Sequence, residues 1–216
     1  MAEEPKVYDV AIVGAGFSGA LIANELAKHP HNKTVVILGA GTIGLLLLAV
    51  IRAHGAKRVV VTDRLPVKLA LAAQLGADAV LDAAADDIVA QARAALGESA
   101  DVVFDCVAVA ATVRQAIGMA SKGGTVVIVG VPADDVNVPL PVVQDHQIRI
   151  QGSATYLPED YAESIRLLVE GDVRVDDIVT AEVPLTRVAD AYALSSGGQH
   201  VKVLVAVDEQ LFAQTS

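Results

Sequence analysis

The sequence predicts an α/β fold with a doubly wound parallel sheet, preceded by an extra βα unit and followed by a short β/α tail. Two observations predict the sheet. Apolar segments typical of strands alternate with segments of helical character from Val7 to Gly171, as in consecutive βαβ units. Hydrophobic residues make up 53% of the 216 residues and aromatic residues only 3%, which suits a buried parallel sheet covered by alanine-rich helices.

Glycines, prolines and aspartates divide the chain into its expected elements. Six strands are predicted from Val35 onwards, the number found in a doubly wound dinucleotide-binding fold, at 35–38, 58–62, 79–81, 101–106, 124–131 and 147–152. Helices are predicted at 43–54, 66–76, 86–97, 110–120 and 158–170, and the segment 136–143, with three prolines nearby, is predicted to be irregular. The tail is expected to hold strands at 178–183 and 201–207 and a short helix at 186–195.

Charge and cysteine usage restrict the partners and the compartment. The formal net charge is −10, which argues against a nucleic-acid or anionic-membrane partner. The single cysteine, Cys106, cannot form an internal disulfide, which fits a reducing cytoplasm. Residues 1–6 lack the basic and apolar pattern of a signal peptide, and the longest apolar run, 43–51, is too short to span a bilayer. We therefore expect a cytoplasmic protein.

A glycine-rich turn with the pattern G-x-G-x-x-G, at Gly39, Gly41 and Gly44, connects the first of these strands to its helix. The first glycine permits a tight turn, the second lets the backbone approach a pyrophosphate, and the third allows close packing of helix on strand. Asp63 ends the next strand, where a carboxylate accepts hydrogen bonds from the adenosine ribose and repels a 2′-phosphate. The pattern favours NAD over NADP, although Arg64 could pair with such a phosphate or flank the adenine. The alternative role for Asp63 is a carboxylate that caps the strand end.

Further stretches carry a family resemblance, at 39–44, 60–64, 73–78, 103–107, 123–131 and 201–205, together with Lys68. With them, residues 33–207 resemble the cofactor-binding half of the medium-chain, zinc-type alcohol and polyol dehydrogenases. The resemblance implies that Lys68 reaches the adenosine ribose, that Val107 lines the cofactor cleft, and that Lys202 approaches the pyrophosphate. The backbone around Val129 and Val131 would meet the nicotinamide amide. The simpler alternatives are solvated lysines and valines that only pack in the core. The cofactor-binding residues expected from motif and resemblance together are Gly39, Gly41, Thr42, Ile43, Gly44, Asp63, Arg64, Lys68, Val107, Val129 and Val131.

The resemblance also shows what this chain lacks. In the family, a separate N-terminal domain supplies the ligands of a catalytic zinc, which needs three protein ligands and an open position. This chain has one cysteine, and the His29-x-His31 pair lies on a connector with no third ligand in view. We therefore expect no zinc and no catalytic residue, and the sequence leaves open whether the chain is an enzyme.

Another glycine-rich turn, Gly14–Gly19, lies about 25 residues before the Gly39–Gly44 turn. It resembles the N-terminus of FAD-dependent oxidoreductases. In those proteins the following strand ends in a glutamate that holds the ribose. Here Gly39 occupies that position. A glycine turn without this glutamate is only half of the dinucleotide-binding motif and cannot enclose a dinucleotide. We therefore expect a structural role for this turn rather than an FAD site. It also suggests a chimera or a truncation.

The expected parts are thus the extra βα unit at 1–32, a Rossmann-like NAD-binding domain at 33–171 and a tail at 172–216, which in the family associates with the missing catalytic domain. Three functions remain open: an NAD(H)-binding module inactive alone, an oxidoreductase subunit completed by a partner chain, and an engineered fold-assembly chimera with incidental binding. The substrate cannot be inferred. We expect a homodimer, because the strand at 147–152 leaves an open sheet edge and the tail strands lack their usual cover.

Overall fold

The computed structural model describes residues 33–156 and 158–207. The predicted unit at 1–32, with the Gly14–Gly19 turn, lies outside them. The strands are β1 (Thr34–Leu38), β2 (Arg58–Asp63), β3 (Ala79–Asp82), β4 (Ala100–Asp105), β5 (Ala120–Ile128), β6 (Arg149–Gly152), β7 (Val179–Pro184) and β8 (Lys202–Ala206). The helices are α2 (Thr42–Ala53), α3 (Pro66–Gln74), α4 (Ile88–Leu96), α5 (Ala110–Met119), α6 (Leu140–Asp145), α7 (Pro158–Val169), the 3₁₀ turn η1 (Leu185–Arg187) and α8 (Val188–Ser196).

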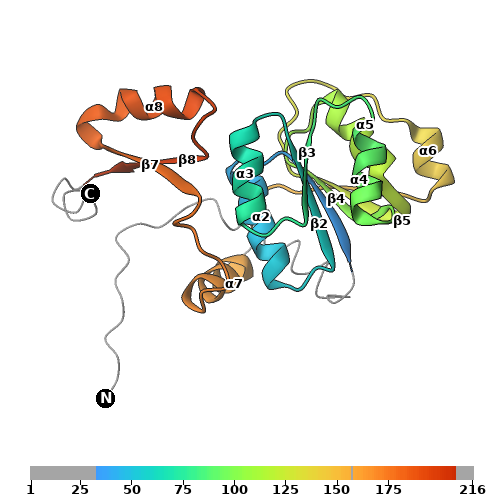
Figure 1. The fold of residues 1–216 in the computed structure, drawn as a ribbon, viewed down its shortest axis with the longest axis horizontal. Coiled ribbons are helices and arrows are strands. Elements are labelled where there is room, and N and C mark those ends of the chain that lie inside the picture. Colours follow the sequence, from blue (N-terminus) through green and yellow to red (C-terminus); the bar gives the residue numbers. More distant parts are fainter. Residues whose placement is uncertain (1–32, 157, 208–216) are drawn as a thin grey trace, which may run out of the picture.

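Six strands form one parallel sheet in the order β3-β2-β1-β4-β5-β6 (Figure 1). This is the order of a doubly wound dinucleotide-binding fold, so the predicted fold class is confirmed. The strand order reverses at β1, which pairs with β2 on one side and β4 on the other. Leu38 therefore lies beside both Thr62 and Asp105. A doubly wound sheet binds its ligand at such a switch point, outside the carboxyl ends of the strands.

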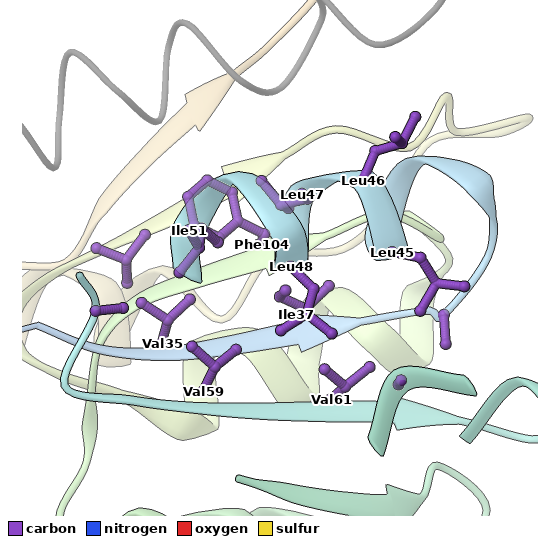
Figure 2. Close-up of a cluster of buried hydrophobic side chains, with 14 of the residues drawn as sticks. Val35, Ile37, Leu45, Leu46, Leu47, Leu48, Ile51, Val59, Val61 and Phe104 are labelled. Carbon is purple, nitrogen blue, oxygen red and sulfur yellow. The ribbon is translucent and has the colours of Figure 1, made fainter. Parts of the chain in front are cut away.

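Each face of the sheet is covered by helices through its own buried cluster. Val35 and Ile37 of β1 point to one face, where they pack with α2 residues such as Leu48 and with Phe104 (Figure 2). Val36 and Leu38 belong to the cluster on the other face, under α4 and α5. All five residues of β1 are buried. Burial on both faces explains why this strand is a continuous apolar run rather than an alternating one.

Two local predictions were wrong. The segment expected to be irregular, 136–143, contains the start of α6, which begins after Pro139 with a second proline, Pro141, in its first turn. Proline there is compatible with a helix, because the first-turn N–H groups have no intrahelical partner. β5 also begins at Ala120, earlier than expected, since Ala120 pairs with Ala100 before the register shifts and Thr125 pairs with Val102.

The C-terminal part forms a separate unit. β7 and β8 make a two-stranded parallel sheet, and η1 and α8 connect them. Figure 1 shows this unit in orange and red beyond α3, outside the six-stranded sheet. It is joined to the main core through Ile178 and Val201, which pack against the cluster that contains α2. No helix within 33–156 and 158–207 is long and apolar enough to cross a membrane.

Candidate cofactor site

The turn between β1 and α2 is formed by two glycines in close contact. Gly39 has a φ of +97°, which L side chains rarely adopt, and its N–H donates to the Thr62 carbonyl at 2.8 Å. A Cβ added to Gly44 would lie 1.9 Å from the Gly39 carbonyl oxygen. Helix and strand therefore approach more closely here than any side chain permits.

Gly41, between them, faces open space. A Cβ added to Gly41 would have no atom within 4 Å. The packing of this chain therefore does not require a glycine at this position. Gly41 is also the N-cap of α2, whose first turn carries neither a side-chain cap nor an acidic residue. The first N–H groups of a helix lack intrahelical acceptors and carry a partial positive charge. The turn thus offers backbone donors to an anion at a position where there is room for one.

Asp63 ties the turn to the neighbouring strand. Its Oδ2 accepts from the Ala40 N–H at 2.8 Å, and its Oδ1 accepts from the Leu65 N–H at 2.9 Å. The capping role considered as the alternative is therefore real. Each carboxylate oxygen keeps a second lone pair, and the half-buried residue remains accessible. Asp63 can brace the turn and still accept hydrogen bonds from a ribose.

A cavity of about 750 Å³ opens beside Asp63 at the carboxyl end of the sheet. That volume is within the range of small-molecule sites. Its walls are largely apolar, and Arg64 is the one cationic residue among them. The guanidinium forms no ion pair with any residue the structure describes. The lining residues are Gly39, Thr62, Asp63, Arg64, Leu65, Ala83, Ala84, Val107, Val109, Ala111, Thr112 and Gln115.

The loop after β4 forms the facing wall. Asp105 is fully buried, and its Oδ1 accepts from the N–H groups of Val107 at 3.0 Å and Ala108 at 2.8 Å. Ala108 is held at a φ of 58°, in the left-handed region. A Cβ added to Gly39 would lie 2.8 Å from Cγ2 of Val107. The Val107 side chain therefore lies directly against the glycine turn.

Cys106 adds no chemistry to this wall. Burial, together with the neighbouring Asp105 carboxylate, raises the pKa of its thiol to about 12. The thiol is therefore protonated at neutral pH, whereas nucleophilic attack and metal binding require the thiolate.

The cavity brings together four of the eleven predicted cofactor residues: Gly39, Asp63, Arg64 and Val107. Gly41, Thr42, Ile43 and Gly44 form the turn and the start of α2. Lys68 lies half-buried on α3, and Val129 and Val131 follow β5, with Val131 91% exposed. None of these seven lines the cavity. The roles of the individual residues remain predictions.

Most residues of the far wall were not predicted from the sequence. Ala83 and Ala84 follow β3, and Val109, Ala111, Thr112 and Gln115 lie before or on α5. They have no motif of their own. The rule that ligands bind outside the carboxyl ends of parallel strands could have indicated them, once the order of β2, β3 and β4 was known.

Within the described parts of the chain, no group of three or more His, Cys, Asp or Glu side chains is placed to hold a metal ion. His29 and His31 lie outside the described residues. The described residues therefore do not fit a zinc centre.

The strand order, the glycine turn and the cavity are those of a Rossmann-like nucleotide-binding domain. A sequence profile described as zinc-binding dehydrogenase matches residues 42–170. The chain belongs to this family, which is alcohol dehydrogenase-like and uses nicotinamide dinucleotides.

Individual relatives agree with this assignment. Sorbitol dehydrogenase of Ovis aries is 31% identical over 164 residues, which cover 74% of this chain and 46% of that protein. The chain thus spans about half the length of the curated relatives it matches. Alcohol dehydrogenase TADH of Thermus sp. ATN1 superimposes with a TM-score of 0.80 at 28% identity, covering 90% of this chain and 56% of that one. A Sinorhizobium meliloti 1021 protein bound to NADP gives 0.78 at 31% identity, covering 88% and 57%.

Proposed function

We propose that this chain binds NAD(H) across Gly39–Gly44, with the adenosine ribose on Asp63, as the cofactor half of an alcohol or polyol dehydrogenase. The observation that carries the proposal is the placement of Asp63. Its carboxylate braces the turn through the Ala40 N–H and also lines the 750 Å³ cavity. A bound nicotinamide would accept or release a hydride, while the chain itself binds and orients the cofactor.

We propose NAD rather than NADP as the preferred cofactor. A 2′-phosphate beside the ribose would lie close to the Asp63 carboxylate and be repelled. Arg64 opposes this preference, because it is exposed, lines the same cavity and has no carboxylate partner in the described chain. The relative bound to NADP makes NADP the specific alternative.

We propose that the chain alone does not oxidise alcohols. The described residues bring together no set of metal ligands, and the chain corresponds to about half of its curated relatives. The second candidate is an oxidoreductase subunit completed by a partner chain. Stoichiometric zinc with NAD-linked turnover that disappears on chelation would favour that candidate. An engineered chimera with incidental binding remains a third hypothesis, and a lack of dinucleotide affinity would favour it.

We also propose a homodimer in the cytoplasm. All four residues of β6, one of the two edge strands of the six-stranded sheet, are exposed, including Ile150 at 40%. Leu140 of the preceding helix is 67% exposed. An open edge next to exposed apolar side chains favours pairing with a second copy. Sedimentation at micromolar concentration tests this, and a single species of monomer mass would contradict it.

Titration of the intact chain with NADH and NADPH, followed by cofactor fluorescence, tests the cofactor proposal. Asp63→Ala should weaken NADH binding by about 1.5–3 kcal/mol, the value of a hydrogen bond to a charged group, and reduce the discrimination against NADPH. Asp82→Ala is the matched control. Asp82 lies opposite Asp63 in the sheet register and accepts a similar bond from the Ala84 N–H at 2.9 Å, yet it does not line the cavity. Equal affinities in wild type and Asp63→Ala would refute the assignment.

A further inference from the structure

A second, smaller cavity lies at the opposite edge of the sheet, where the parallel strands begin. Its volume is about 100 Å³. Because parallel strands start at the same edge, residues distant in the sequence meet there. They come from the residue before β1, the start of β4, β5 and the start of β6: Lys33, Asp101, Val102, Ser121, Lys122, Gly123, Gly124, Thr125, Val127 and Arg149.

The register shift in β5 creates this cavity. Ala120 pairs with Ala100 and Thr125 with Val102, so four residues of β5 lie opposite one residue of β4 between these two pairs. The backbone is tightly packed in this stretch of β5, because a Cβ added to Gly124 would lie 2.9 Å from the Ser121 carbonyl oxygen. It places Ser121 and Lys122 at the cavity.

The wall contains an unpartnered hydroxyl. Thr125 is only 7% exposed, and its hydroxyl forms no hydrogen bond with any residue in the described ranges. Val127, two positions along the strand, lines the same cavity, so the two side chains share a face of the sheet. The hydroxyl oxygen is not fully enclosed by protein atoms, so it is free to donate to a ligand in the cavity. The position suits a ligand that accepts a hydrogen bond.

Three cationic residues line the same cavity as this hydroxyl. Lys33, Lys122 and Arg149 all line the cavity, and none of them pairs with a carboxylate within 33–156 and 158–207. Arg149 makes one long bond, at 3.4 Å, to the Gly123 carbonyl. The single carboxylate of the lining, Asp101, is engaged through one oxygen: its Oδ2 accepts from both the N–H and the hydroxyl of Thr34, at 2.9 and 3.2 Å.

We propose that this cavity binds a small tetrahedral oxyanion of the phosphate class. Three unpaired cations in one place repel each other, and they are unusual in a chain whose net charge is −10. An oxyanion would neutralise them and accept a hydrogen bond from the Thr125 hydroxyl. The volume limits the buried part of the ligand to about one such group, either a free ion or the terminal phosphate of a larger molecule. The site is separate from the dinucleotide turn at the other edge.

Calorimetric and thermal-unfolding titrations of the intact chain with inorganic phosphate test this site, with potassium chloride holding the ionic strength constant. We expect saturable binding and an increase in unfolding temperature. Thr125→Val and Lys122→Gln should each weaken binding about tenfold, as expected for a lost hydrogen bond to a charged group. Lys57→Gln is the matched control, since Lys57 lies at the same edge but is paired with Glu98 at 2.8 Å, and its phosphate affinity should equal that of wild type.

Two further measurements complete the test. Without phosphate, Lys122→Gln should unfold at a slightly higher temperature than wild type, because a repelling charge is gone. Glycerol 3-phosphate in place of phosphate distinguishes the ligand source: equal binding favours a phosphate monoester, and weaker binding favours the free ion. The proposal is overturned if phosphate acts no differently from chloride, if both variants bind like wild type, or if NADH displaces the phosphate.

Discussion

The six-stranded sheet and the C-terminal unit of β7, α8 and β8 differ sharply in burial. Every residue of β1 is buried, and four of the six residues of β2. In the C-terminal unit, all five residues of β8 are only half-buried, and β7 has one buried residue, Val183. The six-stranded sheet is covered on both faces by its own helices, whereas the two-stranded sheet packs against α8 and against the side of the main core.

This difference shows which part of the molecule holds the cofactor geometry. The glycine turn, Asp63 and the facing loop after β4 all belong to the well-buried sheet. The C-terminal unit contacts the turn from outside, where the Thr42 hydroxyl donates to the Val201 carbonyl. It also exposes apolar side chains, including Tyr192 at 74% and Leu185 at 48%. A unit with little burial of its own depends on neighbouring surfaces for its stability.

The largest effect is expected from filling the glycine turn inside the sheet. Gly44→Ala places a Cβ 1.9 Å from the Gly39 carbonyl oxygen, so helix and strand must separate at a cost of about 3 kcal/mol or more. Gly41→Ala is the matched control, since its Cβ meets nothing within 4 Å. It should cost less than about 1 kcal/mol yet weaken NADH binding by occupying the ligand's space. Chemical denaturation and NADH titration check both, and similar stabilities would contradict this account of the turn.

A matched pair of truncations compares the two regions directly. Val61 on β2 is fully buried and Val183 on β7 is 5% exposed. Val61→Ala should lower the free energy of unfolding by about 2–3 kcal/mol, from lost apolar burial plus a cavity that the packed sheet cannot close. Val183→Ala should cost about 1 kcal/mol, because a loosely covered unit can collapse around the gap. Equal losses in chemical denaturation would mean that the two regions are packed alike.

The features that could be predicted from the sequence are those set by local patterns, and the features that could not depend on how the strands pair. The six strands were predictable because buried apolar runs such as 35–38 lie between glycines and charged residues. The glycine turn and Asp63 were predictable because motif and spacing are local. The β5 register shift was not, since it depends on the pairing of Ala120 with Ala100 across the sheet. The far wall of the cavity, such as Gln115, was missed because it reaches the site only through the strand order.

The smallest effect concerns the link between the two regions. Thr42→Val removes the hydroxyl that donates to the Val201 carbonyl, at a cost of about 0.5–1.5 kcal/mol. Since this hydroxyl ties the start of β8 to the first residue of α2, the loss should appear as faster amide hydrogen exchange in Lys202–Ala206, with protection in Thr34–Leu38 unchanged. Thr180→Val is the comparison, because its hydroxyl accepts from the Val201 N–H at 2.9 Å within the C-terminal unit. It should loosen β8 in the same way but leave NADH binding untouched, whereas Thr42→Val acts on a residue of the glycine turn and should change both. If Thr42→Val accelerates exchange equally in β1 and β8, the two regions unfold as one cooperative unit and the contrast between them is limited to burial.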